Sequence, residues 1–407
     1  MQALKTFLVF INFTVALFVA VLALTGFAQA EKVIYSFSGV ADGYGPDAPL
    51  TLDSAGNLYG TTSAGGPNDG AGTVFMLTRS GATWTKTILY SFTGGSDGAN
   101  PYSRVIFDGS GNLYGTTDGG GDFGCGTVFE LTPSSGGWTQ RTIYAFIGAG
   151  QGDGCNPFAG LTIDTTGNLF GTTQTGGNGE GIVFELTPSG GGWTETVLWA
   201  LNGVEGGAPR SGVVFDNAGN IYGTASSGGV FGGGTVFRLT RASGGGWSGA
   251  SIFSFTGGAN GCSPFGGVVF DSVGNLYGTT QLCGTDEVGT VFRLTPTIGQ
   301  WQMSVIHTFT GAVDGAYPLT GVVFDSAGNL WGTTYYGGLF GNGTVFRLSP
   351  PSNGRRWTES EYSFTGGNDG ASPSAGVTFG NSGTTVFGTT TGGGTNDLGV
   401  VYQISVK

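Results

Sequence analysis

The sequence predicts an all-β fold, a seven-bladed β-propeller with four strands per blade. First, a GTT-type element recurs seven times, at steps of 52 to 56 residues. Second, each repeat holds four short apolar runs separated by Gly, Asn and Asp clusters, which is typical of strands joined by β-turns. Third, no helical periodicity follows residue 30. Four strands in a repeat of fixed length indicate one propeller blade. The Gly of the element lies at Gly60, Gly115, Gly171, Gly223, Gly278, Gly332 and Gly388.

Three further landmarks keep the same spacing and also occur seven times. A GTVF-like run begins at Gly72, Gly126, Gly181, Gly234, Gly289, Gly343 and Gly399. An aromatic-rich run is centred on Tyr35, Tyr90, Tyr144, Trp199, Phe253, His307 and Tyr362. A proline opens the first strand of each blade at Pro46, Pro101, Pro157, Pro209, Pro264, Pro318 and Pro373. We therefore expect residues 31–407 to form a single propeller domain.

The two ends of the repeat array predict how the ring closes. The run VIYSF at 33–37 has the pattern of a fourth strand, and GVVYQIS at 399–405 has that of a third strand. The N-terminal strand is therefore expected to complete the last blade, which leaves no open sheet edge at the seam. Within a blade, adjacent residues such as Leu113 and Tyr114 point to opposite faces, and both are expected to be buried against neighbouring blades.

Composition agrees with a packed all-β protein. The chain has 84 Gly and 14 Pro among 407 residues, but also 30 Phe, 14 Tyr and 8 Trp, which a disordered chain lacks. Its formal net charge is −12, and no basic run is present. Nucleic acids and anionic membranes are therefore not expected as partners. We expect a monomer.

Residues 1–30 are predicted to be a signal peptide. Lys5 precedes an apolar stretch from Phe7 to about Ala28, and Ala28-Gln29-Ala30 offers small residues at a cleavage site. The stretch is long, so retention as a membrane anchor is the alternative. Cleavage predicts a secreted or periplasmic protein without a membrane contact.

The repeat unit resembles that of the GloVer tandem-repeat proteins of bacterial surfaces. The resemblance rests on the pattern YSFxGxxDGxxPxxGVxFDxxGNLYGTTxxGGxxGxGTVFxLTP, which covers essentially all of 33–405. It implies export but no particular activity. Members of the family often carry a C-terminal anchor, whereas this chain ends in QISVK. Free secretion or periplasmic residence is the expectation.

An acidic residue precedes most of the prolines by four positions, in a DGxxP loop. A ring of carboxylates at one end of the propeller would suit Ca²⁺, which prefers oxygen ligands. The favoured interpretation is a tight turn in which Asp binds its own backbone, because the residue recurs in every blade. The metal candidates are Asp42, Asp97, Asp153, Asp314 and Asp369, with Glu205 and Asn260 at the equivalent positions. No other cofactor is expected.

A second recurring Asp, in the FDxxGN hairpin, is predicted to form turns at the opposite end of the propeller. Its positions are Asp53, Asp108, Asp164, Asp216, Asp271 and Asp325, and Gly380 stands in the last blade.

The loops between second and third strands vary, and loops that vary on a fixed frame are where binding residues concentrate. Exposed aromatics beside carboxylates suit a sugar or a peptide. The alternative is that the Phe side chains only pin their own loops. The ligand-binding candidates in these loops are Asp69, Asp122, Phe123, Glu180, Phe231, Asp286, Glu287, Tyr335, Tyr336, Phe340 and Asp397.

Arg104 is a further candidate, because most blades have Gly at its position on the inner strand. It would either bind an anion at the channel mouth or pair with a nearby Asp, and pairing is favoured.

The four cysteines predict two disulfides. Cys155 and Cys262 occupy the same repeat position two blades apart, which is too far to pair. Cys125 and Cys283 lie in loops beside them, so we expect Cys125–Cys155 and Cys262–Cys283. Free thiols are the alternative, which an oxidising compartment disfavours.

The sequence gives no distinctive catalytic set. His307 is the only histidine, and it fills an aromatic strand position, so triad and His-metal chemistry are not expected. The leading hypothesis is a non-catalytic propeller that binds an extracellular glycan or protein on its variable loops. A glycosidase with two carboxylates, or a purely structural envelope protein, is the alternative.

Overall fold

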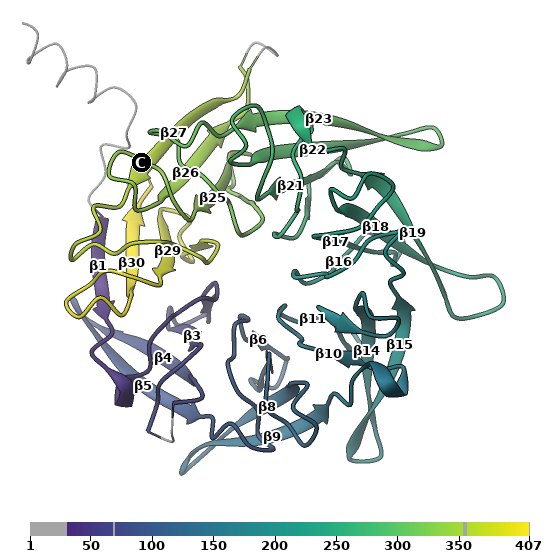
Figure 1. Ribbon diagram of the computed structural model, residues 1–407. Helices are drawn as coiled ribbons and strands as arrows, with labels where there is room; N and C mark the ends of the chain where they lie inside the picture. Colours follow the sequence, from purple (N-terminus) through teal and green to yellow (C-terminus); the bar gives the residue numbers. More distant parts are fainter. Residues whose placement is uncertain (1–30, 68–69, 353–355, 407) are drawn as a thin grey trace, which may run out of the picture.

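In the computed structural model, which describes residues 31–67, 70–352 and 356–406, seven four-stranded sheets surround a common axis (Figure 1). The predicted propeller is confirmed. The predicted signal peptide, residues 1–30, lies outside the described residues. Within the described part, no helix has the length and apolar character needed to cross a bilayer.

The strands of the first four blades follow one another from the inside of the ring to the outside. Blade 1 holds β2 (Thr51–Leu52), β3 (Leu58–Thr62), β4 (Thr73–Ser80) and β5 (Thr83–Ser91). Blade 2 holds β6 (Ile106–Phe107), β7 (Leu113–Thr117), β8 (Thr127–Ser134) and β9 (Gly137–Ala145). Blade 3 holds β11 (Thr162–Ile163), β12 (Leu169–Thr173), β14 (Ile182–Ser189) and β15 (Gly192–Ala200). Blade 4 holds β16 (Val214–Phe215), β17 (Ile221–Ala225), β18 (Thr235–Arg241) and β19 (Trp247–Ser254).

The remaining three blades repeat the pattern, with the last one built from both ends of the array. Blade 5 holds β20 (Val269–Phe270), β21 (Leu276–Thr280), β22 (Thr290–Thr297) and β23 (Gln300–Thr308). Blade 6 holds β24 (Val323–Phe324), β25 (Leu330–Thr334), β26 (Thr344–Ser349) and β27 (Thr358–Ser363). Blade 7 holds β28 (Thr378–Phe379), β29 (Thr385–Thr390), β30 (Val400–Ser405) and β1 (Glu31–Ser36). Loop elements are η1 (Val40–Asp42), η2 (Ala149–Gln151), η3 (Gly258–Asn260) and the small sheet of β10 (Gly154–Cys155) and β13 (Thr175–Gly176).

The ring is closed by the N-terminal strand, as predicted. β1 pairs antiparallel with β30, from Glu31 opposite Ile404 to Ser36 opposite Val400. The side chains of Ile34 and Phe37 are buried against blade 1, together with Leu50 and Phe75. The seam is therefore packed like any other boundary between blades.

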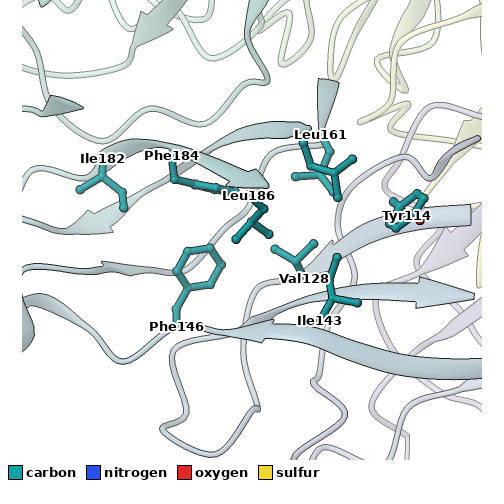
Figure 2. Packing of buried hydrophobic residues seen from close by; sticks show 9 residues of the cluster. Tyr114, Val128, Ile143, Phe146, Leu161, Ile182, Phe184 and Leu186 are labelled. Carbon is teal, nitrogen blue, oxygen red and sulfur yellow. The ribbon is translucent and has the colours of Figure 1, made fainter. Parts of the chain in front are cut away.

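The hydrophobic core is divided among the seven boundaries between blades. Each boundary holds one cluster of buried side chains. Figure 2 shows the cluster between blades 2 and 3, where Tyr114 and Phe146 meet Leu161 and Phe184. Leu113, next to Tyr114 in the chain, is buried at the other face of blade 2. Both faces of a blade are thus apolar, as the sequence predicted.

The repeated GTT element serves packing at three levels. Its Gly lies over the aromatic ring of the third strand, so a Cβ on Gly115 would stand 2.5 Å from Cζ of Phe129. Its first Thr donates a hydrogen bond to the next blade, as from Thr116 to the Ala159 carbonyl at 2.9 Å. Its second Thr bonds within the blade, as Thr117 does with Thr127 at 2.8 Å. The first Thr bonds to the next blade in all seven blades, through Thr61, Thr116, Thr172, Thr224, Thr279, Thr333 and Thr389.

We expect Gly115→Ala to destabilise the ring by about 1–3 kcal/mol, because the added methyl must displace Phe129 in a packed core. The backbone of Gly115 does not have positive φ, so the loss of stability measures the steric clash of the added methyl and not backbone strain. Urea unfolding measures it as a lower midpoint at an unchanged slope. Gly109→Ala is the matched control, because a Cβ there meets no atom within 4 Å. Equal loss in both variants would contradict the packing argument.

Both predicted disulfides are present, and all four cysteines are used. Cys125–Cys155 spans 30 residues and joins the β7–β8 loop of blade 2 to the segment entering blade 3. Cys262–Cys283 spans 21 residues and lies within the loops of blade 5. One disulfide therefore links two blades, while the other fastens loops of a single blade.

Candidate functional site

Two sets of loops share one end of the propeller, here called the variable-loop face. It consists of the loops between second and third strands and the segments that connect one blade to the next. The two sets pair through short bridges, such as Ala99 with Gly119 and Ala316 with Tyr336. The hairpins that hold the FDxxGN motif lie at the opposite end. The predicted division between the two ends is confirmed by this strand order.

Exposed apolar side chains gather on the variable-loop face. Of fourteen large hydrophobic residues that are exposed in the described structure, eleven lie in its loops. They are Val40, Phe123, Ile147, Val204, Val230, Phe231, Leu282, Val313, Tyr336, Leu339 and Phe340. Val273 and Ile298 lie at the opposite end and Val305 lies on a strand.

The three loop phenylalanines are largely open to solvent. Phe123, Phe231 and Phe340 are 61%, 62% and 53% exposed, so each keeps more than half of its surface available to a partner. Ligand binding and pinning of the loop both stay predictions. Tyr335 and Tyr336 form a different group, since their rings meet edge to face with centroids 4.5 Å apart. Tyr336 also lies 6.2 Å from Tyr317. The face therefore offers isolated Phe side chains over several blades and one Tyr cluster in blade 6.

The candidate carboxylates of this face are distributed over the ring. Asp122, Asp286, Glu287 and Asp397 are exposed, and Glu180 is half-buried. They belong to blades 2, 3, 5 and 7. Asp397 accepts a hydrogen bond from the Gly393 amide at 2.7 Å. Within the described ranges, none of these five carboxyl groups hydrogen-bonds to another. Asp69 lies outside the described residues.

The aspartates of the DGxxP loops are turn residues in this structure. Asp97 accepts hydrogen bonds from the Tyr90 hydroxyl at 2.9 Å and from the Thr93 amide at 2.8 Å. The same Tyr and backbone partners hold Asp42, Asp153 and Asp369. At Asp314 the Tyr is replaced by His307, whose Nε2 lies 3.3 Å from the carboxylate. Among the described residues, no group of three or more His, Cys, Asp or Glu side chains could hold a metal ion.

The FDxxGN aspartates close hairpins at the opposite end. Asp108 accepts hydrogen bonds from the amides of Ser110 and Asn112 and from the Asn112 side chain. Burial alone would raise the pKa of Asp108, but these bonds lower it below its usual value. The same pattern holds at Asp164, Asp216, Asp271 and Asp325. The predicted turn role is confirmed.

The residues that follow the seven prolines form a ring around the axis at the variable-loop face, here called the axial ring. Its members are Asp47, Tyr102, Phe158, Arg210, Phe265, Leu319 and Ser374. Tyr102 stacks on Phe158 with centroids 4.9 Å apart, and the Arg210 guanidinium lies 4.4 Å from the ring of Phe265. Ser374 donates to Asp47 at 3.0 Å across the seam.

The sequence reasoning did not identify the axial ring. The sequence signal for the axial ring is the position directly after the repeated proline. The proline is the same in all seven repeats, whereas the residue after it differs in chemical type from one repeat to the next. Variation there means that the frame is fixed by the proline while the neighbouring side chain is free to differ, as in the variable loops.

Arg104 stands two residues beyond Tyr102 and is exposed. Its guanidinium has no ion pair or hydrogen bond within the described structure, so the expected pairing with a nearby Asp is not found. Surrounding protein still desolvates the group and lowers its pKa. Arg104 is thus a charged side chain near the axis that makes no polar contact with the described protein.

A further group of carboxyls lies between the outer strands of neighbouring blades. Glu195 on β15 faces Asp153, and Glu359 on β27 faces Glu361 and Asp314. Burial, and then the neighbouring negative charges, raise the pKa of Glu195 to about 7 and that of Glu359 to about 8. One carboxyl oxygen of each, Oε1, is buried without a hydrogen-bond partner. Glu195 and Glu359 lie on outer strands, whereas Asp153 and Asp314 belong to connecting segments of the variable-loop face. The contacts between them bear on stability.

Comparison with solved structures agrees with the fold. PorZ, a surface component of the type IX secretion system of Porphyromonas gingivalis, aligns with a TM-score of 0.53 at 13% identity, covering 90% of this chain and 48% of PorZ. An ancestral GH74 enzyme aligns with a TM-score of 0.61 at 12% identity, covering 92% of this chain and 48% of the enzyme. This chain spans about half the length of both. A search of curated proteins found no match.

The fold and the arrangement of the loops define the class of this protein. It is a seven-bladed propeller with two disulfides and one variable-loop face. The family model described as the Gloeobacter/Verrucomicrobia repeat matches residues 20–217, 141–323 and 211–407, which together span the propeller. The protein belongs to this repeat family, as the resemblance of the repeat unit predicted.

Proposed function

We propose that this protein is a secreted or periplasmic, non-catalytic propeller that binds a glycan or protein ligand on the variable-loop face. The observation that carries the proposal is the collection of exposed apolar side chains on that one face. Single apolar residues scattered over a surface are ordinary, but eleven of the fourteen large exposed ones in the described structure lie on this face, which supports a contact surface there.

The location rests on the two disulfides, because disulfides persist in oxidising compartments outside the cytosol. The non-catalytic character rests on the scatter of the loop carboxylates over four blades. A glycosidase needs two carboxyl groups about 5–10 Å apart around one bond. Within the described residues, no hydrogen bond joins two of these loop carboxyl groups, which supports the assignment.

The test is thermal melting of the chain from Glu31 onward against soluble polysaccharides and peptidoglycan fragments. A ligand at about 100 times its dissociation constant adds about 2.7 kcal/mol, which corresponds to roughly 3 °C for a chain of this size. Melting with EDTA and with Ca²⁺ checks the proposed turn role of the DGxxP carboxylates. A shift with Ca²⁺ would make them metal ligands instead.

Matched variants locate the binding surface. Replacing Phe123, Phe231 and Phe340 together by Ser should abolish the shift, because it removes the three most exposed large aromatic side chains of the face. Replacing Val273 and Ile298 by Ser changes exposed residues at the opposite end and should leave the shift intact. A shift that survives the triple variant would remove the variable loops from the site. Hydrolysis of a polysaccharide that is lost in Glu180→Gln would overturn the non-catalytic assignment.

A further inference from the structure

Arg104 occupies a position around the axis where the other blades have almost no side chains. The equivalent residues are Pro49, Gly160, Gly212, Gly267, Gly321 and Gly376. These inner segments approach closely, since a Cβ on Gly212 would lie 2.9 Å from the Gly160 carbonyl oxygen. A Cβ on Gly160 would in turn lie 3.2 Å from Cγ of Arg104. In the described part of the chain, Arg104 is therefore the one charged side chain at this level of the ring.

The guanidinium of Arg104 keeps its hydrogen-bonding capacity. Arginine presents five N–H donors in a planar fork that matches a carboxylate. No acceptor among the described residues takes any of them, although the side chain is open to solvent. Lys86, another desolvated cation, is by contrast paired with Asp42 at 2.9 Å. Arg104 differs because its surroundings are glycine backbone and no carboxylate reaches it.

The axial ring at the same end of the inner segments adds a second cation. Arg210 has no ion pair within 4.0 Å in the described structure, and its Nε is buried without a hydrogen-bond partner. Its guanidinium lies over the ring of Phe265 at 4.4 Å and that of Phe158 at 5.8 Å. Burial lowers the pKa of Arg210, and the negative charge of Asp118 partly offsets this effect. Two cations thus lie near the axis in a chain whose net charge is −12.

We propose that Arg104 anchors an anion-binding site at the axis, which takes the single carboxylate of an otherwise neutral ligand. A carboxylate suits the planar fork, and Phe158 and Phe265 offer apolar surface to the remainder of the ligand. A dianion or polyanion is disfavoured by Asp47, Asp118 and the net charge. The inference rests on the proposed function in one respect, since the ligand enters from the variable-loop face.

The experiment is calorimetric titration of the chain from Glu31 onward, in a buffer without carboxylate or phosphate. Two pairs of probes separate the sources of the carboxylate. Galacturonate is compared with galactose for a sugar acid, and an acetylated Gly-Gly-Phe peptide is compared with its amide for a chain end. We expect the acid of at least one pair to bind 10-fold or more tightly than its neutral partner.

Arg104→Gly is the decisive variant, because five blades fold with Gly at this position. It should abolish the preference for the acid, and Arg104→Lys should keep part of it. Failure of all acids to bind at 50 mM, or an unchanged preference in Arg104→Gly, overturns the proposal. If inorganic phosphate binds in a way that depends on Arg104 and no carboxylate binds, the assignment of a carboxylate as the ligand is overturned.

The Ser triple variant at Phe123, Phe231 and Phe340 separates this inference from the proposed function. The proposed axial site does not include these three residues, so carboxylate binding should survive in that variant. Retained carboxylate binding in a protein that shows no response to polysaccharides or peptidoglycan fragments would support the axial site and count against the loop surface. If the unmodified chain responds to a polysaccharide or peptidoglycan fragment but binds no carboxylate probe, the result would support the loop surface and overturn the axial site.

Discussion

A chain that begins at residue 38, without the closing strand β1, should lose cooperative folding and associate through the exposed edge of β30. The six residues of β1 pair with β30 along its length, and Ile34 and Phe37 fill the cluster between blades 7 and 1. Removing them exposes a sheet edge and part of a core. Burying two large apolar side chains alone contributes about 3–6 kcal/mol. Circular dichroism on heating and size-exclusion chromatography measure the two consequences.

A circular permutant provides the control for this deletion. Because Glu31 lies opposite Ile404, residues 31–37 can follow the C-terminus through a short turn and re-form the same antiparallel pair. The permutant should recover the melting temperature and the monomeric elution of the intact chain. If the shortened chain melts as cooperatively as the intact one, the closing strand does not hold the ring.

Raising the pH from 5 to 8.5 should destabilise the protein, through the carboxyls between its outer strands. Burial raises the pKa of Glu31, Glu195 and Glu361 to about 7 and that of Glu359 to about 8. In this range the folded state binds more protons than the unfolded state, so the free energy of unfolding falls as pH rises. The loss begins near pH 4.5 and is complete above about pH 8. We expect about 1–2 kcal/mol for each group.

Glu359→Gln tests this prediction, because the amide stays neutral at every pH. It should raise the melting temperature at pH 8.5 and change it little at pH 5. Glu287→Gln makes the same chemical change at an exposed loop position and should have no effect at either pH. Glu195→Lys should also stabilise at pH 8.5, since it would face Asp153 as Lys86 faces Asp42. A flat pH profile for the unmodified chain would contradict the assignment.

The loss of stability expected at acidic pH, below about pH 4, has a separate cause. The hairpin aspartates, such as Asp108 and Asp325, have pKa values lowered by hydrogen bonds. Their contribution is present above pH 3.8 and is lost as pH falls through the lowered values. Stability is therefore expected to be greatest near pH 4 to 5.

The fold was predictable because every blade repeats the same strand pattern and the same contacts with its neighbours. Seven copies of Gly and Thr at fixed spacing, with Phe on the third strand of six blades and Tyr402 in the seventh, identify strands whose register needs no long-range information. The disulfides followed from the same frame, since Cys125 and Cys155 could be placed in adjacent loops. The end of the ring that carries the variable loops was likewise set by strand order alone.

The details of the site depend on geometry that the repeat does not encode. Whether Phe123 folds back or stays exposed is decided by the path of its own loop. The stack of Tyr102 on Phe158 joins two blades, so neither residue reveals it alone. Glu195 lies in a strand that mostly alternates between exposed and half-buried residues, and Glu359 lies in one that is largely half-buried. Neither pattern shows that these carboxyl groups face Asp153 and Asp314.

The threonine pairs at the base of the variable loops have a consequence for how such a protein diversifies. Thr117 with Thr127, and Thr334 with Thr344, join the two strands at the point where each loop leaves them, at 2.8 and 2.9 Å. We expect insertions or substitutions beyond that point to leave the strands below undisturbed. Blades 1, 2, 5 and 6 have such a pair, so their variable loops are expected to change in sequence one at a time while the strands of the ring keep their structure.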